Sequence, residues 1–326
     1  MKKLLLLLVG LLILSVGNAF AIPLWPSNSF YPNGNIQGGT IFEDDNLDYF
    51  IEMDEELIED TDLQSDTYGE MIANPDYGKI TVGDVLTSAI EFPKVKQNPF
   101  GDTYATDEAN DELVAISTIQ LKSITDAGTA DEFWWFGEYD DGVDATNDSM
   151  VQFYTGLGDS NFDANTDLSL SDSLAAIVDG ATFLWSFSID ANDPDTFWNF
   201  SPIGAGADDP ELVRVASTGT KVGSVNYALN QTDGLDIFNL VGLDDPKLGM
   251  AIGYAGGFAA WIAAGGDGHT DLEGSGDILG AGGRSNGAFA TSDIDVITNP
   301  IPEPATLTLF GFSLLGLAFV GRRRRK

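Results

Sequence analysis

The chain lacks cysteine entirely and has a single histidine among its 326 residues. Without cysteine, the protein can form neither a disulfide framework nor a thiolate metal site. The one histidine, His269, lies in a glycine-rich stretch, and no recognisable nucleophile motif accompanies it. These absences leave little basis for a Ser-His-Asp or zinc active site, and we expect the protein not to be an enzyme.

Basic residues are scarce as well: 15 lysines and arginines stand against 51 aspartates and glutamates, for a formal net charge of −36. Seven of the basic residues lie at the two ends of the chain, so the body between them is more acidic still. Such a surface repels nucleic acid and anionic lipid headgroups, and we expect no nucleic acid partner. It suits divalent cations, cationic polymers or solubility outside the cell.

Long runs of helix-favouring residues are largely missing from the body, whereas short alternating stretches separated by Gly, Asp, Asn and Pro are common. Residues 113–121 show the clearest alternation, with Leu113, Ile119 and Leu121 on one face and Val114 and Ile116 on the other. This pattern predicts a mainly β protein, arranged as an antiparallel β-sandwich or jelly roll.

Four other stretches carry weaker signals. Residues 40–66 are dense in acid, and their apolar spacing predicts either one short amphipathic helix or a solvated acidic arm. Residues 168–178 predict a short helix capped by Ser169 or Ser171, and 249–266 could hold another. The glycine-rich residues 265–287 predict a loop.

The C-terminus combines three features. Residues 305–320 are an uncharged run of 16 residues, preceded by Pro302, Glu303 and Pro304. Five basic residues close the chain, namely Arg322, Arg323, Arg324, Arg325 and Lys326. As a helix the run spans about 24 Å, so with its flanks it just crosses a hydrocarbon core of about 30 Å. Basic clusters favour the cytoplasmic face, so we predict a transmembrane helix with its C-terminus inside and the body outside.

This three-part tail resembles the PEP-CTERM sorting signal of exopolysaccharide-producing Gram-negative bacteria. The matching residues are Pro302-Glu303-Pro304-Ala305-Thr306, the helix at 307–320 and the Arg322 to Arg325 cluster. The resemblance implies recognition and cleavage near the motif by exosortase, an integral-membrane enzyme. The alternative is an ordinary tail anchor with a fortuitous Pro-Glu-Pro.

The N-terminus carries a second targeting signal. Lys2 and Lys3 precede an apolar run at residues 4–16, and Ala19-Phe20-Ala21 forms a small-residue cleavage site. We therefore predict export through the translocon and cleavage by signal peptidase after Ala21. The predicted organisation is a signal peptide at 1–21, an acidic and partly disordered segment at 22–77, a β-rich extracellular domain at 78–298 and the sorting signal at 299–326.

One acidic loop is a candidate calcium site. Oxygen-bearing side chains alternate there at Asp159, Asn161, Asp163, Asn165 and Asp167, and calcium prefers six to eight oxygen ligands. The loop is not an EF-hand, because Ala164 and Leu170 stand where that motif needs Gly and Glu. A polar loop between strands explains the same residues, as turn chemistry does for the weaker candidates at 140–144 and 190–195.

An aromatic cluster at residues 133–136 is the second candidate. In a strand, Trp134 and Trp135 point to opposite faces, so at least one of them belongs to the core. The other could present a flat ring to a sugar. Glu132 and Glu138 flank the cluster and are the pair to test for glycoside hydrolysis.

The two targeting signals predict a precursor anchored in the inner membrane, with its C-terminus in the cytoplasm. The body is then delivered to the cell surface or the extracellular matrix. We expect a structural or adhesive role in association with exopolysaccharide. The alternatives are a carbohydrate-binding module and a polysaccharide-active hydrolase. Calcium is the only cofactor that the sequence suggests.

Overall fold

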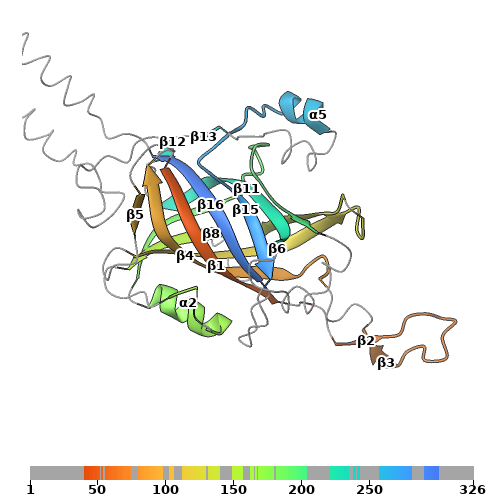
Figure 1. Cartoon of the computed structure of the whole chain (residues 1–326). Coiled ribbons are helices and arrows are strands. Elements are labelled where there is room, and N and C mark those ends of the chain that lie inside the picture. Colours follow the sequence, from red (N-terminus) through yellow and green to blue (C-terminus); the bar gives the residue numbers. More distant parts are fainter. Residues whose placement is uncertain are drawn as a thin grey trace, which may run out of the picture.

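The computed structural model describes residues 40–51, 53, 56–74, 80–97, 103–105, 112–129, 131–139, 149–156, 162–164, 166, 168–179, 181–203, 221–234, 238–239, 241–242, 257–280 and 290–300. These residues form mainly antiparallel β structure with two short helices, as Figure 1 shows. The predicted signal peptide, the Pro302-Glu303-Pro304 motif and the transmembrane helix at 305–320 lie outside them. Within the described part of the chain, no helix is both long enough and apolar enough to cross a membrane.

The strands follow one another along the chain with few helical interruptions. They are β1 (Thr40–Ile51), β2 (Leu57–Glu59), β3 (Met71–Ala73), β4 (Val85–Gln97), β5 (Thr103–Ala105), β6 (Glu112–Thr125), β7 (Phe133–Glu138), β8 (Val151–Gly156), β9 (Thr182–Ser188), β10 (Phe197–Pro202), β11 (Lys221–Gly234), β12 (Phe238–Asn239), β13 (Val241–Gly242), β14 (His269–Thr270), β15 (Leu272–Gly280) and β16 (Ala290–Pro300). The helices are α2 (Leu170–Val178) and α5 (Gly257–Ala263).

Twelve of these strands belong to one antiparallel sheet that closes on itself. Its order is β10-β7-β6-β8-β9-β11-β15-β16-β1-β4-β5, with β12 paired to β16. Two further pairings, β4 with β6 and β10 with β11, join distant points of this path and complete the ring. The mainly β, antiparallel prediction is confirmed, whereas the two-layered sandwich is not. An alternating strand pattern is the same in both arrangements, so the sequence could not distinguish them.

The wall between β6 and β11 is divided in two. Each of these strands has 14 residues and pairs with two neighbours along one edge. β6 pairs with β8 through residues 112–117 and with β7 through residues 119–125. β11 pairs with β10 through residues 223–228 and with β9 through residues 230–234. The β8–β9 pair therefore fills one half of the wall and the β7–β10 pair fills the other.

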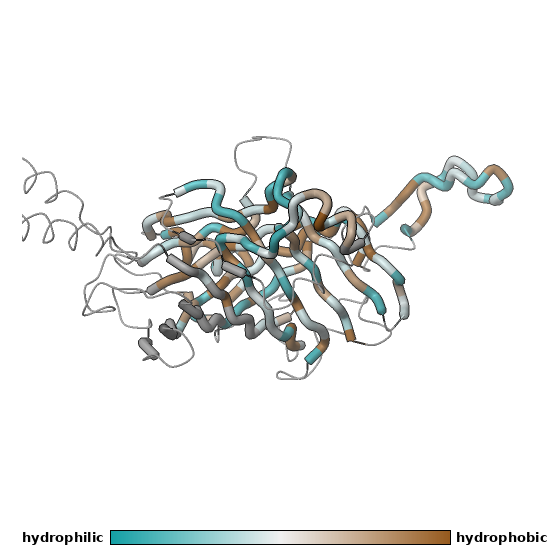
Figure 2. Tube along the Cα trace, turned by 90° about the horizontal axis from the view of Figure 1, so that it is seen from above, coloured by the Kyte–Doolittle hydropathy of each residue, from teal (hydrophilic) through white to brown (hydrophobic). Residues whose placement is uncertain are grey.

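Apolar side chains pack on both faces of this sheet. Alternation along the strands is visible as brown and teal segments in Figure 2. The predicted alternation at residues 113–121 is confirmed: Leu113, Ile119 and Leu121 pack in the interior cluster, while Val114 and Ile116 pack outside. The interior cluster is rich in aromatic rings from β7, β8, β9, β10 and β11.

Helix α2 covers the outer apolar face over β4, β6 and β8 (Figure 1). It begins after Ser169, whose side chain accepts a hydrogen bond from the Asp172 amide, so Ser169 is the cap. Ile177 is buried against the sheet. Tyr49 of β1 ties the helix down, because its hydroxyl lies 2.9 Å from Ser173 Oγ and donates to the Leu168 carbonyl oxygen at 3.0 Å.

Two predictions of local structure are wrong. Residues 40–51 form β1 rather than a helix or an arm, so the sheet begins well before the predicted domain start at residue 78. Residues 272–280 form β15, a strand between β11 and β16, rather than part of a glycine loop. Gly274 is required in this strand because an added Cβ would lie 2.3 Å from the Tyr227 ring. The helix predicted within 249–266 is present in part, as α5.

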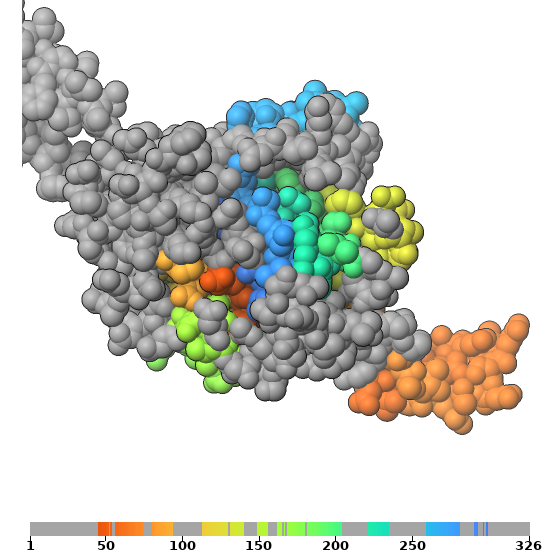
Figure 3. Space-filling view, viewed as in Figure 1, coloured from red at the N-terminus to blue at the C-terminus, as the bar shows by residue number. Residues whose placement is uncertain are grey.

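The hairpin formed by β2 and β3 projects from the closed sheet (Figures 1 and 3). Its turn is organised by Asp60, whose carboxylate accepts from the Asp62 amide at 3.0 Å and from Thr67 Oγ1 at 2.6 Å. Hydrogen bonds from the side chains of Ser65 and Thr67, and then from the Asp62 amide, lower the pKa of Asp60 below its usual value. The hairpin exposes Leu63 and Met71 to solvent.

Candidate functional site

The predicted calcium loop lies almost wholly outside the described residues. Of its five candidate ligands only Asp163 is described, while Asp159, Asn161, Asn165 and Asp167 are not. Asp163 is exposed, and its backbone carbonyl accepts hydrogen bonds from the Thr166 amide at 2.9 Å and the Thr166 hydroxyl at 2.6 Å. Among the described residues there is no group of three acidic or histidine side chains suited to a metal. Calcium binding by this loop stays a prediction.

The aromatic residues of β7 alternate between the interior and the outer face of the closed sheet. Trp134 is only 1% exposed and makes an edge contact with Phe200 inside the closed sheet. Phe133 and Trp135 are half-buried on the outer face, with ring centroids 6.4 Å apart and planes 21° from parallel. Any sugar platform on this strand must therefore be built from Phe133 and Trp135, without Trp134.

Glu132 and Glu138 do not form a catalytic pair. They lie at opposite ends of β7, about 20 Å apart at roughly 3.3 Å per residue. Paired carboxylates of glycosidases are separated by about 5–9.5 Å. Each is also engaged: Glu132 accepts from Trp134 Nε1 and the Gly128 amide, both at 2.5 Å, and Glu138 accepts from Ser188 Oγ.

Asp195 belongs to residues 190–195, one of the weaker calcium candidates. In the structure its carboxylate anchors the glycine-rich loop before β14. It is 2% exposed, and its Oδ1 accepts from Trp261 Nε1 at 2.8 Å. Its Oδ2 accepts from three successive amides, those of Asp267, Gly268 and His269, at 3.0, 2.9 and 3.3 Å. A carboxylate that accepts several backbone N–H groups is well stabilised when buried. Asp195 therefore joins the β9–β10 turn to the loop after α5.

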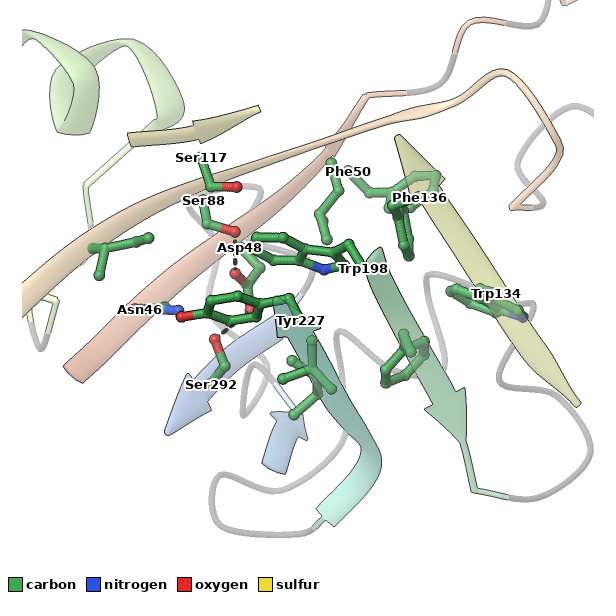
Figure 4. Close-up of a pocket in the computed structure, with 15 residues that line it drawn as sticks. Asn46, Asp48, Phe50, Ser88, Ser117, Trp134, Phe136, Trp198, Tyr227 and Ser292 are labelled. Atoms are coloured by element: carbon green, nitrogen blue, oxygen red, sulfur yellow. Dashed lines mark hydrogen bonds between the residues drawn. The ribbon is translucent and has the colours of Figure 1, made fainter. Parts of the chain in front are cut away.

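The candidate site is a cavity inside the closed sheet, which was not predicted from the sequence (Figure 4). Its volume is about 30 Å³. One side is a row of polar residues from β16, β1, β4 and β6, and the other is an apolar, mostly aromatic wall. The lining residues are Asn46, Asp48, Phe50, Leu86, Ser88, Ile90, Ser117, Trp134, Phe136, Trp198, Phe200, Val225, Tyr227, Ile278 and Ser292.

Asp48 occupies the middle of the polar row. The strand register places Asp48 opposite Ser88, and Ser88 opposite Ser117. Ser88 Oγ donates to Asp48 Oδ1 at 2.6 Å and Ser292 Oγ donates to Oδ2 at 3.0 Å, as the dashed lines in Figure 4 show. Burial raises the pKa of Asp48 from 3.8 to about 6, and the two serine hydrogen bonds only partly oppose this effect.

Two further polar atoms on this cavity have no hydrogen-bond partner in the described part of the protein. They are Asn46 Oδ1 and Ser117 Oγ, on side chains that are 4% and 0% exposed. Leaving a buried oxygen unpaired costs free energy, so each such atom calls for a ligand or a water. The aromatic wall includes Trp198 stacked on Tyr227, with centroids 4.3 Å apart. The cavity can therefore hold a water or another very small polar ligand, but not a sugar ring.

Sequence analysis missed this cavity because it assigned residues 40–66 to a helix or an acidic arm. The available signal was the period of two at 46–49, where Asn46 and Asp48 alternate with Leu47 and Tyr49. Here the polar residues face the interior and the apolar residues face α2. This reverses the usual assumption that the polar face of an alternating strand is the solvent face.

Comparison with known proteins gives one finding, at the C-terminus. Residues 300–325 match the family model described as the PEP-CTERM protein-sorting motif. No curated protein and no solved structure matches the chain significantly. The match confirms the resemblance drawn from Pro302, Glu303 and Pro304 and is confined to this segment. The chain thus carries a PEP-CTERM sorting motif, which implies an exported protein whose membrane-anchored precursor is sorted and processed by exosortase.

Proposed function

We propose that the exported body is a structural or adhesive protein of the cell surface or extracellular matrix, acting in association with exopolysaccharide. The sorting motif at residues 300–325 is the observation that carries this proposal. The acidic composition and the closed sheet fit a body that must stay soluble and folded outside the cell without disulfides. A non-catalytic role is supported by the structural engagement of Glu132 and Glu138.

The processing step in this proposal is tested by the intact mass of the protein from its own host. We expect a C-terminus close to Pro302, with the apolar helix and the Arg322–Arg325 cluster removed. A variant with Pro302 and Pro304 both replaced by alanine is expected to keep the full tail and to remain in the membrane fraction. A wild-type protein that leaves the cell with Lys326 still attached would contradict processing.

A carbohydrate-binding role is the second candidate, and a specific surface on β7 favours it. Phe133 and Trp135 lie side by side on the outer face, and the strand register places Asn199 of β10 opposite Trp135. The Asn199 amide is buried, and neither of its polar atoms has a hydrogen-bond partner in the described residues. The two half-buried rings are the accessible part of this surface and can stack on a sugar ring, whereas the buried Asn199 amide does not reach solvent.

Binding to polysaccharide purified from the host tests this second candidate. We expect Trp135→Ala to weaken binding about tenfold or more without changing the melting temperature, because Trp135 is half-buried at the surface. Phe183→Ala is the matched control, since Phe183 is an exposed aromatic on β9. Equal binding by wild type, Trp135→Ala and Phe183→Ala would remove the β7 surface from consideration.

A further inference from the structure

The interior cavity contains a negative charge with no counterion among its described lining residues. Asp48 is 3% exposed, and its two oxygens accept hydrogen bonds from the neutral hydroxyls of Ser88 and Ser292. None of the lining residues is basic, and Tyr227 is the only other ionisable side chain among them. A buried carboxylate without a positive partner is costly, so it takes up either a proton or a cation.

The oxygen atoms around Asp48 distinguish between a proton and a cation as the partner of its charge. Asn46 Oδ1 can only accept, and it has no partner in the described residues. Ser117 Oγ is unpartnered in the same way. Asn46 lies two residues before Asp48 on the same face of β1, and Ser117 lies opposite Ser88. A proton on Asp48 would neutralise the charge but could not serve both of these oxygens.

We propose that the cavity binds one monovalent metal cation, Na⁺ or K⁺, held by the Asp48 carboxylate, with the unpartnered oxygens of Asn46 and Ser117 lining the same space. A single positive charge balances the single carboxylate, and hard oxygen ligands suit alkali-metal ions. The volume of about 30 Å³ is enough for one ion that has lost most of its hydration shell. The rings of Trp198 and Tyr227 complete the wall, and aromatic faces attract cations.

Other small occupants fit less well. Calcium usually takes six to eight oxygen ligands with more than one carboxylate, and Asp48 is the only acid that lines the cavity. An anion would meet a carboxylate and no basic side chain among the described lining residues. Water alone would satisfy Asn46 and Ser117 but would leave the charge of Asp48 uncompensated. A bound cation both balances the charge of Asp48 and interacts favourably with the unpartnered oxygens of Asn46 and Ser117.

The site makes stability depend on the ions outside the cell. A cation that binds the folded chain and not the unfolded chain adds to the free energy of unfolding. An exported chain without disulfides would in this way gain stability from the salt of its surroundings.

Thermal unfolding of the purified exported protein tests the proposal. The protein is melted at pH 8 in sodium, potassium or tetramethylammonium chloride of equal ionic strength, with EDTA present so that divalent ions bound elsewhere do not contribute. We expect the melting temperature to be about 2–5 °C higher in sodium or potassium chloride, in a saturable manner.

Variants and a direct probe distinguish cation binding in the cavity from a general effect of salt on the acidic surface. Asp48→Asn is expected to abolish the cation-dependent shift, Ser117→Ala to require more salt for the same shift, and the exposed control Asp131→Asn to keep it. Crystals grown with Rb⁺ should show an anomalous peak next to an Asp48 oxygen. Equal melting temperatures in the three salts, or crystals with no such peak, would mean that the cavity holds water only and would overturn the proposal.

Discussion

At the scale of single residues, Asp48 is an acidic side chain in a buried position that disfavours its charged form. An acid is buried in the middle of a closed sheet, with only serine hydroxyls to stabilise its charge. Its pKa is raised from 3.8 to about 6, so the folded protein binds this proton more tightly than the unfolded chain does. The stabilisation from this group is fully present below pH 3.8 and is lost as the pH rises through 6.

Asp48→Asn should therefore stabilise the protein at alkaline pH. In a buffer whose only cation is too large for the cavity, we expect a gain of about 2–3 kcal/mol at pH 8, because the amide carries no charge. The gain should disappear below about pH 4, where the wild-type carboxyl is neutral in both states. Urea denaturation of both proteins across this range measures the difference. A constant difference at every pH would show that the substitution acts through packing and not through charge.

At the scale of elements, helix α2 shows how local chemistry and tertiary contact combine. Nine residues are too few for a stable isolated helix, so α2 depends on its cap and on Ile177 and Tyr49 against the sheet. We expect Ser169→Ala to cost about 1 kcal/mol in urea denaturation, because the Asp172 amide loses its acceptor.

Ser171→Ala is the matched control for this prediction. Ser171 lies on the exposed first turn, its Oγ only 3.1 Å from that of Ser169, but it does not cap the helix. Its replacement should change stability by less than about 0.5 kcal/mol. An equal loss in the two variants would assign the cap to both serines.

The elements also show what the sequence could and could not predict. Residues 113–121 and α2 were predictable because their apolar periodicity and cap chemistry agree with their final positions. β1 was not predictable from the sequence, because its interior face holds the polar residues Asn46 and Asp48. β15 was not predictable either, because Gly274 makes room for Tyr227, a contact between residues 47 positions apart in the chain. Cavity and closure both depend on such distant contacts, which no local pattern encodes.

At the scale of the whole molecule, the closed sheet sets where the chain can be cut. β16 lies between β15 and β1 and ends at Pro300, just before the sorting motif. A protein truncated after Pro300 should keep its melting temperature, because every described strand is retained. A protein truncated after Gly280 loses β16 and leaves edges of β15 and β1 unpaired, so we expect it not to fold cooperatively. Circular dichroism during heating distinguishes the two, and a cooperative transition in the shorter protein would contradict the role given to β16.

The pairing of β1 with β16 also has a consequence in time. β1 is the first described strand and β16 the last, so the ring cannot close before residues 290–300 are available to pair. Contacts of such long sequence separation form late in folding. The sorting motif begins where β16 ends, so the last strand and the motif are adjacent in the chain. The order of the sequence thus places every described strand before the Pro302-Glu303-Pro304 motif, so a chain that carries the motif already contains the whole ring.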